Sequence, residues 1–173
     1  MRYAIAFIAA WFLAVLNVSV MPFINVLGVS PDLVLIFAAS WAVVRNEDEA
    51  LVVVPMAGLL RDLLSSDPLG TSIIGFAPIV ILAAVVRLQA IDSDFIPALL
   101  IVAGGSLTFG VIQMMVLAGT GQNILLFHSV FQVIVPSVLV NALFTPIIYS
   151  PVRWLSPRPA TGLMGARRLT SPL

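Results

Sequence analysis

The sequence predicts an all-α fold, a multi-pass membrane bundle of about six transmembrane helices. Its residues are 61% hydrophobic and only 9% charged. The apolar residues come in runs of about 15 to 25, and short polar breaks between the runs hold nearly every charge. A hydrocarbon core about 30 Å thick is crossed by about 20 helical residues, so these runs are typical of membrane spans. We therefore expect an integral membrane protein.

Five apolar segments end at turn or charged residues, and each predicts one transmembrane helix: residues 3–23, 33–44, 50–64, 71–86 and 95–117. The first contains Asn17 and ends near Pro22, and the second begins after Pro31-Asp32. The charged residues 45–49 and the turn Pro68-Leu69-Gly70 separate the next segments.

The last apolar stretch, residues 124–149, is too long for one upright span and contains Pro136. Proline removes a helical hydrogen bond and clashes with the preceding turn. We therefore expect an interfacial or tilted helix over 124–135, with His128 and Gln132 on one face, followed by a last span over 136–149. A single kinked helix is the alternative.

The arginines predict the orientation. With the N-terminus in the cytoplasm, all but one of the eight basic residues fall on the cytoplasmic side: Arg2, Arg45, Arg87, Arg153, Arg158, Arg167 and Arg168. Cytoplasmic loops of membrane proteins carry an excess of basic residues, so both termini are expected inside. Residues 1–155 then form a single transmembrane domain, and residues 156–173 form a mobile cytoplasmic tail.

Several classes of chemistry are excluded by residue types that the chain lacks. Without cysteine it has no disulfide and no thiolate metal site, and its one histidine, His128, is expected to make an interfacial contact. Without lysine it has no Gly-rich phosphate loop, and it has no Gly-x-Ser-x-Gly elbow. The net charge of zero gives no footprint for nucleic acid. We predict a non-enzymatic protein with no cofactor and no metal.

Two charges inside the third segment are the strongest local signal. Arg61 and Asp62 interrupt an apolar helix, where charges are costly and mark functional sites. As neighbours they point about 100° apart, so each needs another partner, for which Asn17 is a candidate. They form either a structural clamp between spans or a site for a partner protein or solute. Asp67 lies beyond Asp62 on a proline turn, which does not favour a catalytic pair of carboxylates sharing a proton.

Asp32 is expected to be the N-cap of the second helix, where its charge also suits the helix dipole. In the predicted topology Asp32 and the region 62–67 both lie on the outer side of the membrane and together cap the bundle. The predicted polar cluster, with a structural or partner-binding role, is Asn17, Asp32, Arg61, Asp62 and Asp67.

Small residues form a second feature, in the fifth segment. Gly104, Ser106, Thr108 and Gly110 make two small-xxx-small pairs, and such faces let helix backbones approach closely in lipid. This face could serve packing within the chain or an interface with a partner helix, and a ligand crevice is a third interpretation.

The order of these features resembles the rod shape-determining protein MreD family. The matching pieces are Pro31-Asp32-Leu33-Val34-Leu35-Ile36, then Trp41-Ala42, then Ala57-Gly58-Leu59-Leu60-Arg61-Asp62-Leu63-Leu64 leading to Pro68-Leu69-Gly70. Length, span count and topology agree over most of the chain, whereas only the hydropathy pattern matches from Phe95 onward.

The resemblance implies a scaffold subunit of the bacterial elongation (Rod) machinery, which helps organise side-wall peptidoglycan synthesis and cell shape. It implies binding to MreC and indirect association with MreB filaments, RodA and a class B penicillin-binding protein, as well as with membrane lipid. The family is also similar to the substrate-binding subunits of energy-coupling-factor vitamin transporters, so a solute-binding membrane subunit is the alternative. Few intramembrane polar residues are available for a solute pocket, chiefly Asn17, Asp62, Gln113 and Asn141, which favours the scaffold.

Overall fold

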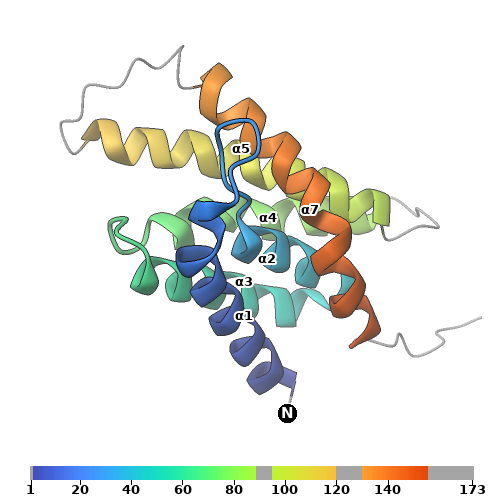
Figure 1. Ribbon diagram of the computed structural model, residues 1–173. Helices are drawn as coiled ribbons and strands as arrows, with labels where there is room; N and C mark the ends of the chain where they lie inside the picture. The colour runs from blue at the N-terminus through green and yellow to red at the C-terminus, as the bar shows by residue number, and fades with distance from the viewer. Residues whose placement is uncertain (1, 89–94, 120–129, 156–173) are drawn as a thin grey trace, which may run out of the picture.

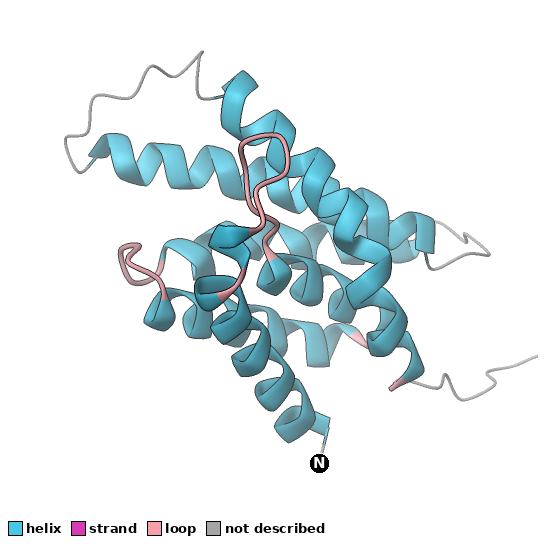
Figure 2. Cartoon of the chain, in the orientation of Figure 1, coloured by secondary structure: helices cyan, strands magenta, loops and turns pink. Residues whose placement is uncertain are grey.

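The computed structural model describes residues 2–88, 95–119 and 130–155, which are helical apart from short connections (Figure 1, Figure 2). These residues form six α-helices: α1 (Arg2–Ser19), α2 (Leu33–Val44), α3 (Glu47–Leu64), α4 (Thr71–Leu88), α5 (Phe95–Gly119) and α7 (Val135–Trp154). A 3-10 turn, η1 (Met21–Phe23), follows α1, and a π-helical turn, η2 (Val130–Ile134), leads into α7. The predicted all-α class is confirmed.

Helix α2 is the central element of the bundle. Eleven of its 12 residues are buried, and it contacts each of the five other described α-helices. A helix that is apolar all round belongs in an interior. The rings of Phe37 and Trp41 contact each other along it in a tilted arrangement, with centroids 5.5 Å apart. At about 18 Å, α2 is shorter than the hydrocarbon core, so at least one of its ends lies below the membrane surface.

Helix α1 lies at the edge of the bundle, against α2 and α3 (Figure 1). Its buried residues Ala6, Ala10 and Ala14 recur at every fourth position and therefore share one face. Small residues on such a face allow close contact between helices in lipid. The opposite face exposes large side chains such as Trp11 and Phe12, as suits contact with acyl chains.

Helices α3 and α4 approach each other closely across the turn at residues 65–70. A Cβ at Gly58 would lie 2.9 Å from the backbone carbonyl of Ser72, so only glycine fits this contact. Gly70 closes the turn with a φ of +95°, a left-handed conformation that glycine adopts without strain. This packing brings the end of α3, with Arg61 and Asp62, beside the start of α4.

The last helix corrects the predicted break at Pro136. The π turn η2 continues directly into α7, so one helical run extends over Val130–Trp154. Pro136 is the second residue of α7, and the wider π turn before it shifts the hydrogen-bond ladder where the proline N–H is missing. The division into a helix over 124–135 and a span over 136–149 is wrong for its described part. Residues 124–129 with His128, and the expected tail 156–173, lie outside the described residues.

Three helical runs in the described part are long and apolar enough to cross a membrane: Arg2–Phe23, Phe95–Gly119 and Val130–Trp154. Leu33–Val44 and Thr71–Arg87 are shorter apolar helices. Helix α3 is less apolar because five charged residues lie in it: Glu47, Asp48, Glu49, Arg61 and Asp62. These helices indicate a multi-pass membrane protein, while the number of spans and the orientation stay predictions.

Candidate functional site at the start of α2

Three side chains satisfy backbone N–H groups at the start of α2. Asp32 is the N-cap, and its Oδ1 accepts from the N–H of Leu35 at 3.1 Å. Asn17 of α1 accepts from the N–H of Leu33 at 2.9 Å. Asn141 of α7 accepts from the N–H of Asp32 at 2.7 Å. The first N–H groups of a helix have no intrahelical partner, and lipid offers none. Asn17 of α1 and Asn141 of α7 therefore provide hydrogen-bond acceptors for the start of α2.

The guanidinium of Arg61, near the end of α3, joins the start of α2 to the start of α4. Its Nε donates to Oδ2 of Asp32 at 2.9 Å. Its Nη1 donates to Oδ2 of Asp67 at 3.0 Å and to Oγ of Ser72 at 2.8 Å. The Arg61 Cζ also lies over the ring of Phe109 in α5, 4.7 Å from the centroid, in cation–π geometry. Because the Arg61 and Asp32 side chains are each only 12% exposed, this is a largely buried ion pair.

Asp62 caps the start of α4 from the neighbouring helix. Its carboxylate accepts from the N–H of Gly70 at 2.8 Å and from the N–H of Ser72 at 3.1 Å. The residue is 1% exposed. A carboxylate at a helix N-terminus gains from the helix dipole as well as from the N–H groups, which stabilises a buried charge.

The predicted polar residues thus lie together, although not with the partners expected. Asn17 was the candidate partner for Arg61 or Asp62, but it binds the α2 backbone instead. Asp62 holds backbone N–H groups and Asp67 holds Arg61, so the two carboxylates have separate partners. The five predicted residues and two further ones, Ser72 and Asn141, form one group. We call it the Asp32 cluster: Asn17, Asp32, Arg61, Asp62, Asp67, Ser72 and Asn141.

Three residues that matter at this site were not in the predicted cluster. Asn141 donates through Nδ2 to Oγ of Ser106 at 2.9 Å, which links α7 to α5. As an amide in an apolar helix, Asn141 carried a signal in the sequence. Gly58 also carried one, because it lies one helical turn before Asp62 and so shares its face toward α4. Ser72 carried none, because hydroxyl residues are common in the first turn of helices.

The small residues of α5 make contacts inside the chain. A Cβ at Gly104 would lie 3.0 Å from Leu82 of α4, and one at Gly110 would lie 2.9 Å from Ile134 of η2. Ser106 is buried against Asn141. Thr108 donates to the carbonyl oxygen of Gly104 within its own helix, at 3.0 Å.

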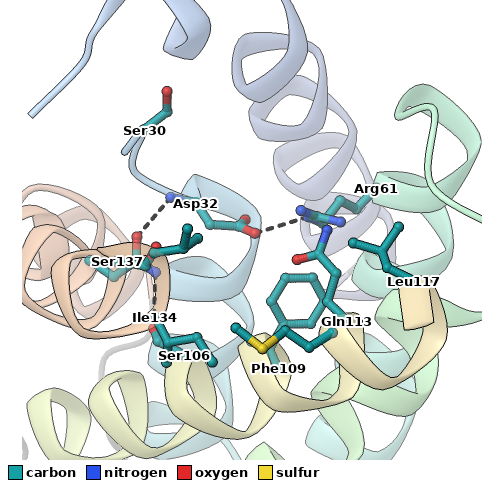
Figure 3. Close-up of a pocket in the computed structure, with 13 residues that line it drawn as sticks. Ser30, Asp32, Arg61, Ser106, Phe109, Gln113, Leu117, Ile134 and Ser137 are labelled. Carbon is teal, nitrogen blue, oxygen red and sulfur yellow. Dashed lines mark hydrogen bonds and ion pairs between the residues drawn. The ribbon is translucent and has the colours of Figure 1, made fainter. Parts of the chain in front are cut away.

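A cavity of about 370 Å³ adjoins the Asp32 cluster, bounded by the start of α2, the end of α3, α5 and the run from η2 into α7 (Figure 3). Its polar lining is Ser30, Asp32, Arg61, Ser106, Gln113, Ser137 and Asn141. Its apolar lining is Phe109, Gly110, Met114, Leu117, Val133 and Ile134. Figure 3 shows the Arg61–Asp32 pair on one side of this space, with Phe109 and Gln113 on α5. The cavity therefore has a charged end and an apolar wall.

A second group of charges lies at the other end of α2. Arg87 donates to the carbonyl oxygens of Ala42 and Arg45, which are at the C-terminal end of the helix where cations are favoured. Glu49 pairs with Arg45 at 3.7 Å and with Arg2 at 3.4 Å. Glu47 pairs with Arg87 at 3.6 Å. We call this group the Arg45 cluster: Arg2, Arg45, Glu47, Glu49 and Arg87.

The described residues contain no group of three or more His, Asp or Glu side chains placed to hold a metal ion. Each carboxylate of the Asp32 cluster accepts hydrogen bonds from the Arg61 guanidinium or from backbone N–H groups. The cluster thus joins helix ends and presents a charged end to the adjoining cavity.

A family model matches most of the chain. The model describes the rod shape-determining protein MreD, and it matches residues 1–157. No curated protein and no solved structure is similar enough to give a match.

Proposed function

Because the chain belongs to the rod shape-determining protein MreD family, we propose that it is a non-enzymatic scaffold subunit of the bacterial elongation machinery. In this role it binds MreC in the cytoplasmic membrane and helps organise side-wall peptidoglycan synthesis. MreB, RodA and a class B penicillin-binding protein associate with it indirectly. The observation that carries the proposal is the family match over residues 1–157, a range that includes every described helix.

In this proposal the Asp32 cluster is a structural clamp. Its side chains join α1, α2, α3, α4 and α7 by hydrogen bonds between residues far apart in sequence. Removing one partner from a buried ionic network leaves an unpaired charge, which is costly in protein and in lipid. The clamp therefore holds the helix ends in one arrangement. A fixed surface suits a scaffold, because less conformational entropy is lost when a partner binds.

The small-residue face of α5 is proposed to pack within the chain, because Gly104 and Gly110 both lie against neighbouring side chains. A partner helix then binds elsewhere, on faces that the bundle leaves exposed to lipid. Such faces occur on five helices, and an exposed residue marks each: Trp11, Leu51, Ile81, Leu107 and Leu143.

The absence of cysteine makes this surface easy to map. Single cysteines at those five exposed positions, expressed with MreC carrying cysteines along its transmembrane helix, allow disulfide cross-linking in native membranes. A single binding face predicts strong cross-links from one or two neighbouring helices and none from the rest. Cross-linking at all five positions alike, or at none, would contradict a defined MreC interface.

Co-purification from native membranes tests the function itself. An affinity-tagged chain is expected to carry MreC with it, while an unrelated multi-pass protein with the same tag does not. Recovery of an ATPase module in place of MreC would overturn the scaffold proposal.

That outcome would support the second candidate, a solute-binding membrane subunit, which the cavity beside Arg61 favours. A volume of about 370 Å³ lies within the range of ligand pockets, about 300 to 1,000 Å³. Against this candidate, most polar groups around the cavity already bond to one another. A water-soluble metabolite that co-purifies and raises the melting temperature when added back would decide for it.

A further inference from the structure

The cavity beside Arg61 is lined on α5 and η2 by partly exposed apolar residues, on a face that we expect to contact lipid. Met114 and Leu117 on its α5 wall are half-buried, and Val133 on the η2 side is 50% exposed. In a membrane protein, a space that is open at such a face is accessible to the surrounding lipid. Its apolar wall would be in contact with acyl chains, and its charged end with a headgroup.

Arg61 has donors left over at the charged end. A guanidinium carries five N–H groups, and the protein bonds to Arg61 involve only Nε and Nη1. Within the described part of the chain, Nη2 donates to no group, and Arg61 lines the cavity. An oxygen-rich acceptor such as a phosphate suits this free edge of the guanidinium.

The summed charge of the side chains at this end disfavours the binding of a simple anion. Arg61 contributes one positive charge, whereas its two ion-pair partners, Asp32 and Asp67, contribute two negative charges, so the sum over these three side chains is −1. Asp67 does not line the cavity itself, but it binds Arg61, which does, at a distance of 3.0 Å. Asp67 is the more exposed of the two carboxylates, at 22% for its side chain. Gln113 lies 3.5 Å from Asp67, at the limit of a hydrogen bond, and so it binds this carboxylate weakly. A ligand with an ammonium group near its phosphate satisfies both the free guanidinium edge and the excess negative charge.

We propose that the cavity binds a zwitterionic phospholipid of the phosphatidylethanolamine type. Its phosphate accepts hydrogen bonds from Arg61, its ammonium group lies by Asp67, and its first acyl carbons lie along Met114 and Val133. The membrane supplies this ligand directly, and the site does not depend on the proposed binding of MreC.

The test is a thermal melting titration of delipidated, detergent-solubilised protein with three short-chain lipids: phosphatidylethanolamine, phosphatidylcholine and phosphatidylglycerol. Phosphatidylethanolamine is expected to raise the melting temperature at concentrations at least about tenfold lower than the other two lipids. Phosphatidylcholine has no ammonium N–H groups to donate to Asp67, and phosphatidylglycerol adds negative charge where the sum is already negative. Equal effects of the three lipids would overturn the proposal.

Two adjacent methionines give a matched pair of variants. Met114→Trp puts bulk into the cavity, whereas Met115→Trp puts the same bulk on a residue that is 68% exposed. The first is expected to abolish the preference for phosphatidylethanolamine, and the second to preserve it. If Met114→Trp folded and kept the preference, the lipid would bind elsewhere and the site assignment would fail.

Asp67→Asn tests the charge argument separately, because it brings the sum at the charged end to zero. Its preference for phosphatidylethanolamine over phosphatidylglycerol is expected to fall by about tenfold. An unchanged preference in a folded variant would contradict the role of Asp67. Loss of MreC capture in Met114→Trp, with lipid binding unchanged, would assign the cavity to a partner helix and refute the lipid site.

Discussion

Both ends of α2 carry arginine–carboxylate ion pairs, yet the pairs differ in burial and geometry. In the Asp32 cluster, Arg61 lies 2.9 Å from Asp32, and both side chains are 12% exposed. In the Arg45 cluster, Arg2 lies 3.4 Å from Glu49, and the Arg2 side chain is 69% exposed. The ion pairs of the first cluster are short and enclosed. Those of the second are longer, and they range from the enclosed Arg45–Glu49 pair, 17% and 10% exposed, to the exposed side chain of Arg2.

The comparison teaches that exposure, more than residue type, decides what a charge does in a membrane protein. Exposed ion pairs contribute only about 0–1 kcal/mol, so the exposed members of the Arg45 cluster, Arg2 and Glu47, add little to stability. Its arginines instead carry the topology signal, because cytoplasmic loops are enriched in basic residues. The buried charges of the Asp32 cluster depend on one another, and the chain is expected to be sensitive to the loss of any one of them.

The largest expected effect comes from removing the cation at the buried end. Arg61→Met leaves Asp32 and Asp67 without their partner and is expected to destabilise the protein by about 3–5 kcal/mol. The matched variant at the other end, Arg2→Met, is expected to cost about 0–1 kcal/mol. Melting temperature and the yield of monodisperse protein in detergent measure both. Equal losses in the two variants would remove the contrast between the clusters.

The next effect concerns the carboxylate that caps α4. Asp62→Asn keeps the shape and one acceptor oxygen but removes the charge, with an expected cost of about 1.5–3 kcal/mol, the value of hydrogen bonds to a charged group. Glu47→Gln is the control, because the Glu47 side chain is 62% exposed and its ion pair is long. The melting temperatures of the two variants give the difference. A purified chain that cleaved peptide or lipid, and lost this activity in a folded Asp62→Asn variant, would instead contradict the non-enzymatic proposal.

Changing the packing beside the Asp32 cluster is expected to alter stability by a similar or smaller amount. Gly110→Leu adds bulk where a Cβ already lies 2.9 Å from Ile134, and such overpacking costs about 1–3 kcal/mol. Gly119→Leu is the control in the same helix, since a Cβ there meets no atom within 4 Å. If the α5 face instead binds a partner, Gly110→Leu would remain stable while MreC capture in a pull-down fell.

The smallest expected effect is a difference between the two clusters in how added salt changes their contribution to stability. Raising the ionic strength to about 1 M shortens the screening length to about 3 Å, which weakens exposed pairs and leaves enclosed pairs nearly unchanged. The small melting difference between Arg2→Met and the parent protein is expected to vanish in high salt. The difference for Arg61→Met is expected to persist, and its disappearance would show that Arg61 is solvated.

Local features of the fold were predictable from the sequence because local chemistry determines them. Residues 33–44 were predicted as a helix and form α2, since Asp32 provides the cap and a charged turn follows. The break expected at Pro136 was wrong, because a π turn precedes this proline and lets the helix continue. A pattern of apolar residues does not distinguish a broken helix from one with a shifted hydrogen-bond ladder.

The site was predictable as a set of residues but not as a network. Arg61 and Asp62 stood out because charges in an apolar segment need partners. Their partners are separated from them by up to 29 residues, as for Arg61 and Asp32, so only the packing of α3 against α2 and α4 determines them. The cavity had no sequence signal, since its wall on α5 and η2 consists of ordinary apolar residues.

The central claim is that the two clusters face opposite sides of the membrane, and cysteine labelling of the loops beside them tests it most directly. Ser66, beside Asp67, and Glu47, in the Arg45 cluster, are both exposed and can be replaced by cysteine in a chain that has none. A membrane-impermeant maleimide applied to intact spheroplasts is expected to label cysteine at position 66, and at Ser30, but not at position 47 or at Ser171. Labelling at position 47 without labelling at position 66 would reverse the topology and contradict the account.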